Sequence, residues 1–145
     1  MDSSTKESSD YFSVSFRIMG DDLDPTIITT LLGIEPDHKH KKGDSNTGKA
    51  KSGKIIYYSP YSSGMWAIKS KLDKHSRIQE HIESILEQLV PKKEMLEKLH
   101  NDGFEMDFYC GYFFEKTPQP GLWITSDTLK KMGDLGIDLG IDLYG

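Results

Sequence analysis

The stretch YFSVSFRI, residues 11–18, alternates large apolar side chains with small or charged ones. The apolar positions are Phe12, Val14, Phe16 and Ile18. This period of two is typical of a β-strand that buries one face in a core and turns the other toward water. Sheets with one solvated face are mostly antiparallel, with helices gathered on the covered side. The stretch therefore predicts a sheet that is covered on one face only.

A capped helix is predicted directly after this strand. Asp24 suits the N-cap position, and Pro25 suits the first helical position because it has no N–H to lose there. Gly33 is placed to end the helix in a left-handed conformation, and Pro36 prevents its continuation. The apolar face is formed by Ile27, Ile28, Leu31 and Leu32.

The middle of the chain predicts a loop, two short strands and a long broken helix. Residues 37–54 contain six lysines, three glycines and no large apolar residue, so we expect a loop there. Strands are expected over 55–58 and 65–68, joined by a turn. Beyond them, apolar residues recur at helical spacing up to Leu89, and Pro91 breaks this helix and begins a second one that ends near Gly103.

The last third of the chain starts with another alternating stretch, FEMDFYCGYFFE, residues 104–115, which predicts a strand. A turn is expected over 117–121 and a strand over 122–125. Ser126 is expected to cap a short helix that Gly136 closes. Residues 137–144 then predict the last strand.

These elements predict one α+β domain over residues 11–145, after a disordered polar tail over residues 1–10. The expected sheet is mostly antiparallel and has about five or six strands. One long broken helix and two short helices pack on one of its faces.

Composition excludes several classes of protein. The single cysteine, Cys110, rules out a disulfide scaffold. No apolar stretch approaches the ~20 residues of a membrane-spanning helix, so no membrane partner is expected. The net charge of -5 disfavours nucleic acid as a partner of the whole surface. Residues 1–10 lack the apolar region of a secretory signal, so we expect a cytoplasmic location.

Several short motifs, taken in order from residue 11 onward, resemble DUF4279, a bacterial family of domains of unknown function. After the opening strand they are Leu23-Asp24-Pro25, Leu32-Gly33-Ile34-Glu35-Pro36, Lys42-Gly43-Asp44, Gly64-Met65-Trp66, the helix broken at Pro91, Leu122–Ser126, Leu135-Gly136-Ile137-Asp138 and Asp142-Leu143-Tyr144. The resemblance implies a bacterial domain and supplies no catalytic residues. Small domains of this kind are associated with toxin–immunity genes, so the resemblance also implies an immunity-like binding role.

A basic segment with aromatic neighbours is the candidate binding surface. Between Asp37 and Lys54 six lysines face only two aspartates, and a group of tyrosines and a tryptophan follows. Clustered lysines attract acidic partners, and aromatic side chains often dominate the binding energy of protein interfaces. We therefore predict a non-catalytic module that binds a protein of unknown identity through His38, Lys39, His40, Lys41, Lys42, Tyr57, Tyr58 and Trp66. The simpler interpretation is a solvated loop beside aromatics that pack in the sheet.

The alternative is a small-molecule or metal-binding domain, or an enzyme, with a pocket near His38, His40 and Trp66. Two histidines two residues apart share a face on a strand and can ligate a metal, although the adjacent lysines repel a cation. A third hypothesis is a homo-oligomer formed through an open sheet edge.

No coherent catalytic set supports an enzyme. Gly48 and Gly53 do not belong to a nucleotide-binding phosphate loop, because Ile55 stands where the required hydroxyl residue would be. Cys110 falls on the apolar register of its strand and is expected in the core. Asp138 and Asp142 would lie roughly 13 Å apart on a strand, too far for one shared site. We therefore expect no cofactor, no metal and no catalytic residue.

Overall fold

A computed structural model describes residues 10–115 and 122–145 and confirms the predicted α+β class. The main sheet has the strand order β2-β5-β1-β6-β7. Its strands are β1 (Tyr11–Gly20), β2 (His38–His40), β5 (Gly64–Lys69), β6 (Glu105–Phe113) and β7 (Asp138–Tyr144). The pairings of β1 with β5 and β6, and of β2 with β5, are antiparallel, whereas β6 and β7 run parallel. The sheet is therefore mixed, because the chain returns from β6 to β7 through a helical crossover.

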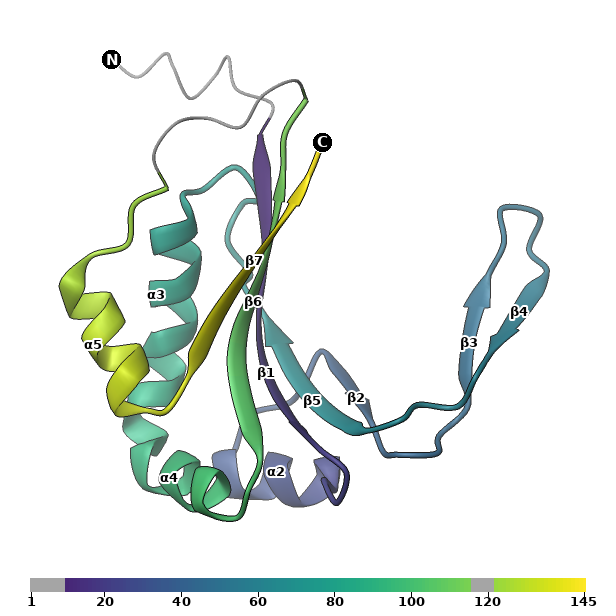
Figure 1. Cartoon of the computed structure of the whole chain (residues 1–145), viewed down its shortest axis with the longest axis horizontal. Helices are drawn as coiled ribbons and strands as arrows, with labels where there is room; N and C mark the ends of the chain where they lie inside the picture. Colours follow the sequence, from purple (N-terminus) through teal and green to yellow (C-terminus); the bar gives the residue numbers. More distant parts are fainter. Residues whose placement is uncertain (1–9, 116–121) are drawn as a thin grey trace.

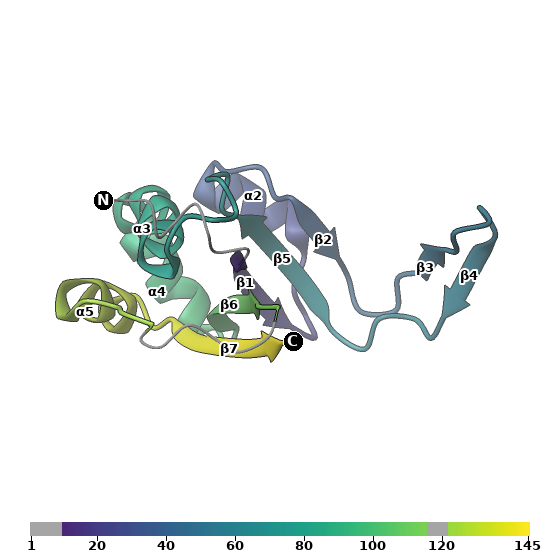
Figure 2. The same ribbon diagram turned by 90° about the horizontal axis from the view of Figure 1, so that it is seen from above.

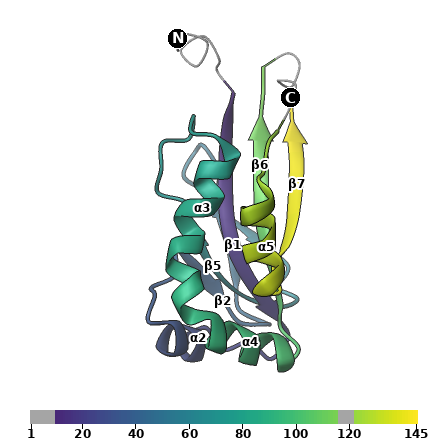
Figure 3. The ribbon, with the colours of Figure 1, turned by 90° about the vertical axis from the view of Figure 1, so that its left-hand side faces the viewer.

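The helices lie on one side of this sheet, with α3, α4 and α5 drawn in front of it in Figure 3. They are α2 (Pro25–Leu32), α3 (Ile78–Leu89), the 3-10 turn η1 (Val90–Lys92), α4 (Lys93–Asn101) and α5 (Ser126–Asp134). Figure 1 shows α2 and α4 at the end of the sheet where β1 ends and β5 begins. The predicted arrangement of helices on one face is confirmed.

The predicted helix signals are confirmed for α2 and for the break at Pro91. The Asp24 carboxylate accepts a hydrogen bond from the Thr26 N–H at 3.0 Å, and Gly33 adopts a left-handed φ of 67°. Pro91 falls in η1, so α4 begins at Lys93 and not at the proline. The proline removes one hydrogen bond of the continuous helix, and the chain tightens for a single turn before it resumes.

The core lies between the covered face of the sheet and α3. Phe16, Trp66 and Phe108 project from three adjacent strands, and the Phe16 ring contacts the other two. The buried face of α3 that packs over them consists of Ile78, Ile82, Ile85, Leu86 and Leu89. The apolar area removed from water here, at about 25 cal/mol per Å², is the main source of stability.

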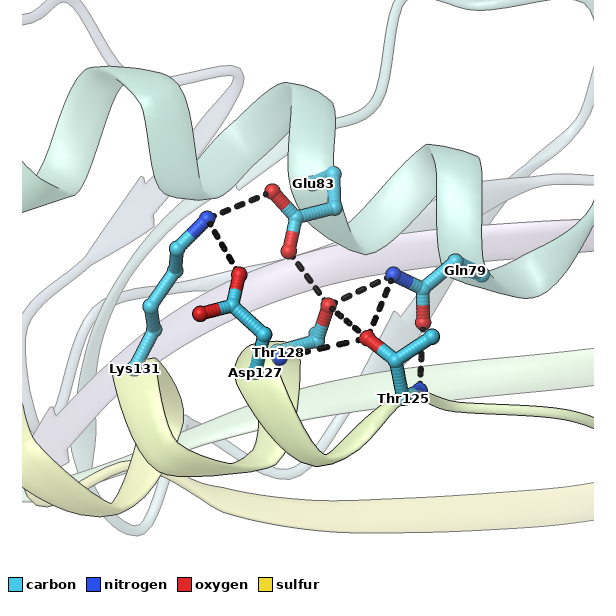
Figure 4. Close-up of polar contacts among 6 residues, drawn as sticks. All are labelled: Gln79, Glu83, Thr125, Asp127, Thr128 and Lys131. Atoms are coloured by element: carbon cyan, nitrogen blue, oxygen red, sulfur yellow. Dashed lines mark hydrogen bonds and ion pairs between the residues drawn. The ribbon is translucent and has the colours of Figure 1, made fainter.

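A polar network joins α5 to α3 (Figure 4). Thr128 has no exposed area, and its hydroxyl donates to Glu83 while it accepts from Gln79 and Thr125. Glu83 also pairs with Lys131 at 3.0 Å. Gln79 in turn accepts from the Thr125 N–H at 3.0 Å. The network satisfies the buried hydroxyl and fixes the helix that leads into β7.

Two sequence predictions about local structure are wrong. Residues 37–54 are not one loop, since they contain β2 and the strand β3 (Asn46–Lys49), which pairs with β4 (Ile55–Tyr58). These strands depend on backbone hydrogen bonds and bury little apolar surface, so hydrophobic patterning does not reveal them. Residues 122–125 form no strand, and Thr125, not Ser126, caps α5 by accepting from the Thr128 N–H. The tail is predicted over residues 1–10, of which 1–9 lie outside the described residues, and so does the turn predicted over 117–121.

We expect the substitution Thr128→Val to lower the free energy of unfolding by about 1–3 kcal/mol. The new side chain has the same shape, but the Glu83 carboxylate and the Gln79 amide lose a buried partner. Urea denaturation measures the change. Thr30→Val, at an exposed threonine of α2, is the matched control and should change stability by no more than about 0.5 kcal/mol. Equal effects of the two substitutions would show that the network contributes nothing.

Candidate functional site

One face of the main sheet carries no helix within the described residues, and we call it the open face. Alternation along β1 turns Ser13, Ser15 and Arg17 toward it, because Val14, Phe16 and Ile18 are buried on the other side. The register places Gly111 beside Ser13 and Ala67 beside Arg17. The middle of the open face therefore carries small side chains on both sides of β1.

An aromatic ladder crosses one end of the open face. Tyr11, Phe113 and Tyr144 are direct neighbours on β1, β6 and β7. Their rings stack in turn, with centroids 4.7 Å apart in both pairs. Gly111 makes room for them, since a Cβ there would approach the Phe113 ring to 3.0 Å. The ladder is a preformed apolar edge on an otherwise polar face.

Arg17 and Asp107 form an ion pair on the open face. Arg17 donates two hydrogen bonds to Asp107, at 2.8 and 2.7 Å, and its guanidinium lies 4.6 Å from the centroid of the Tyr109 ring. The Tyr109 hydroxyl donates to Asp142 at 2.7 Å and lies 2.7 Å from the Tyr144 hydroxyl. The hydrogen bonds with Tyr144 and Asp142 raise the pKa of Tyr109 well above its usual value. These pairings give the open face a fixed arrangement of charge, and Tyr109 is not activated as a base.

A two-stranded hairpin projects from the main sheet, on the side away from α3, α4 and α5 (Figures 1 and 2). We call β3, β4 and their turn, residues 46–58, the arm. Its four consecutive large side chains are all exposed, and Tyr57 has 78% of its surface in solvent. The four are Ile55, Ile56, Tyr57 and Tyr58. The arm also carries Lys49, Lys51 and Lys54 and no acidic residue, so it is apolar and basic at once.

The base of the arm is held by a histidine–tyrosine stack. The His40 ring lies parallel to Tyr61, with centroids 3.5 Å apart, and its edge meets His38 at 5.1 Å. Burial, and the nearby His38, lower the pKa of His40. The Asp44 carboxylate accepts from the Lys41 N–H at 2.8 Å, and its carbonyl accepts from the Tyr61 N–H at 3.1 Å. These contacts fix the direction in which the arm leaves the sheet.

The structure separates the residues that the sequence predicts as one binding surface. His38 and His40 face the open side beside Ala67 and Met65, whereas Lys39 is paired with Trp66 and shares its side of the sheet. Lys41 lies 3.9 Å from Asp24, and Lys42 lies 3.3 Å from Asp21. Tyr57 and Tyr58 are in the arm.

The prediction that Trp66 belongs to that surface is wrong. It has no exposed area, and its indole N–H donates to the Thr29 hydroxyl at 3.0 Å, so it cannot contact a partner. It also lies on the opposite side of β5 from His38 and His40, so these three residues do not line a common pocket. The polypeptide alternates faces at every residue, and the apolar run 65–68 hides which residues point inward.

Other predicted chemistry is likewise dispersed. The Asp37 carboxylate accepts from the Lys69 N–H and pairs with Lys71. Within the described residues no three histidine, cysteine or acidic side chains come together as a metal site. Asp138 and Asp142 share the open face, as expected for one strand, and only Asp142 bonds Tyr109. None of the described helices is long and apolar enough to cross a membrane.

Sequence patterning does not reveal the aromatic ladder, and the sequence analysis also left out the two isoleucines of the arm. Tyr11, Phe113 and Tyr144 become neighbours only through strand register, which is a non-local property. Ile55 and Ile56 do carry a signal, because they continue into Tyr57 and Tyr58 without polar alternation. A strand with apolar side chains on both faces needs a cover on both faces or a partner.

We expect the Cys110 thiol to be unreactive in the native protein. Burial raises its pKa to about 12, and a buried, protonated thiol is a poor nucleophile. Ellman's reagent at pH 8 should therefore detect no thiol in the folded chain. The urea-unfolded chain is the positive control and should release one equivalent, because the sequence contains one cysteine. Rapid reaction of the folded protein would contradict the placement of Cys110 in the core.

Comparison with known proteins gives one match. A family model described as "Domain of unknown function (DUF4279)" matches residues 9–145. No curated protein matches the chain, and no solved structure does. Since the match spans nearly the whole sequence, the chain belongs to the DUF4279 family.

Proposed function

We propose that this domain is a non-catalytic protein-binding module whose arm contacts an acidic protein partner. One observation carries the proposal: four consecutive large apolar side chains stand exposed on a hairpin that projects from the body (Figure 1). An immunity-type inhibitor, which blocks another protein by binding it, is one concrete form of this function.

The energetics of the arm favour a partner. An isolated two-stranded hairpin is only marginally stable in water, so its side chains do little for the fold while they remain exposed. Burying an isoleucine or a similar side chain contributes roughly 1.5–3 kcal/mol. Tyrosines such as Tyr57 and Tyr58 are enriched among the residues that dominate binding energy. An interface that covers the arm would therefore recover energy that the free chain does not use.

Charge supports an acidic protein over a nucleic acid. The three lysines of the arm have no acidic neighbour within it, although the whole chain has a net charge of -5. They would attract a carboxylate-rich surface and speed its association. A protein with a small acidic and apolar surface fits the arm.

Site-specific photo-cross-linking tests the proposal. Benzoylphenylalanine replaces Tyr57 in the arm or, as a matched control, Leu129, an exposed apolar residue of α5 on the opposite side. Illumination in a lysate of the source organism, with nuclease present, should give a discrete protein adduct from position 57 and none from position 129.

Competition then assigns the adduct to the arm. Unlabelled wild-type chain should suppress it, whereas the Tyr57→Ala/Tyr58→Ala variant should compete about tenfold less well or worse. The substitutions affect exposed side chains, so circular dichroism should show an unchanged fold. Equal competition by the two proteins, or the same adducts from both positions, would contradict the proposal.

A further inference from the structure

A pocket of about 270 Å³ lies at the end of the sheet where β5 ends and β1 begins. β5 ends at Lys69, opposite Ser15, whereas β1 begins at Tyr11, so a loop lies beside the first residues of β1 in place of β5. The Ser70 N–H donates to the Val14 carbonyl, and the Phe12 N–H donates to the Lys74 carbonyl, both at 2.9 Å. These two hydrogen bonds hold the loop against β1, and the pocket lies between the loop and the strand.

The residues that line this pocket include basic side chains and no acidic ones. The nine residues that line it include Lys69, Lys74, Ser70 and His81. None of the nine is acidic, although the chain has more acidic than basic residues. The Lys74 ammonium lies 4.5 Å from the centroid of the Tyr11 ring, which holds it at the rim without neutralising it.

His81 is an unexplained buried polar group beside this pocket. Only 2% of it is exposed, its Nδ1 lies 2.7 Å from the Ser70 hydroxyl, and its Nε2 is buried with no hydrogen-bond partner in the described structure. Desolvation is the main cause that lowers the pKa of His81, while the backbone carbonyl of Lys74, then Glu80, the backbone carbonyl of Ser76 and Asp73, act in the opposite direction. Buried polar atoms without a partner are rare and often mark a functional position.

The serine–histidine pair does not form a hydrolase triad. In a triad the second imidazole nitrogen is held by a carboxylate, which fixes the tautomer and stabilises the imidazolium. Here that nitrogen, Nε2, has no hydrogen-bond partner among the described residues, so no carboxylate there orients His81 as a base for Ser70. Binding is better supported than acyl transfer, since every polar side chain at the pocket can donate a hydrogen bond or carry positive charge.

We propose that this pocket binds a small molecule through its phosphate or carboxylate group. Lys69 and Lys74 supply the positive charge, and the Ser70 hydroxyl, backed by His81, supplies a directed hydrogen bond. The volume far exceeds the roughly 30 Å³ share of one water, so it admits a small metabolite as well as a bare ion. The site is independent of the arm, which projects from another part of the molecule (Figure 2).

An NMR titration of the full chain tests the site. Inorganic phosphate and succinate are titrated separately, at constant ionic strength, and backbone amide shifts are followed. We expect saturable shifts centred on Ser70, Lys74 and His81 with at least one of the two probes. Saturation with phosphate alone assigns a phosphate ligand, and saturation with succinate alone assigns a carboxylate. Absence of saturable shifts with both probes would overturn the proposal.

Paired lysine variants separate specific binding from general attraction. Lys69→Gln/Lys74→Gln should weaken binding by about tenfold or more. Lys51→Gln/Lys54→Gln, in the arm, removes the same charge and should leave the affinity unchanged. Ser70→Ala should also weaken binding, and the dispersion of each spectrum reports whether the variant is folded. Equal affinities in the two lysine variants would overturn the proposal without bearing on the arm.

Discussion

Strand β1 occupies the centre of the sheet, hydrogen bonded to β5 on one side and to β6 on the other, and its alternation sets the faces of both neighbours. Phe16 stands opposite Ile68 and Phe108, so the three side chains point to the same side. A slip of one residue would move the apolar set of β1 from the core to solvent. This register therefore decides which groups belong to the core and which form the open face.

Because helices cover only one face of the sheet, the molecule has a packed side and an open side. α3 and its neighbours bury the apolar side, and the network at Thr128 fixes α5 against α3 (Figure 4). The opposite side keeps paired charges, such as Arg17 with Asp107, and small residues. The arm leaves on this second side, where its side chains are free of the packing that stabilises the body (Figure 1). The proposed function uses the exposed side chains of the arm, which contribute little to the stability of the fold.

Sequence patterning predicts the elements whose stability comes from apolar burial. β1, β6, α2 and the helix broken at Pro91 all show a clear period or a capping signal, and all are present. β2 and β3 escape such patterning because edge and hairpin strands are held by backbone hydrogen bonds, which any sequence can make. The same limit applies to the site: Tyr57 and Tyr58 are exposed and Trp66 is buried, and the sequence alone leaves open which of these aromatics pack in the sheet. The aromatic ladder and the pocket beside Ser70 depend on register and on where β5 stops, so they require the structure.

Amide hydrogen exchange of the purified protein, measured at two concentrations, tests most directly whether the arm is an unpacked projection. The account predicts weak protection for residues 46–58 and strong protection for the central strands β1 and β6, with no dependence on concentration. Protection of the arm equal to that of β1 would contradict the account, because it would mean that the arm is already packed in the free protein. If that protection rose with concentration, the arm would be covered by a second copy of the chain.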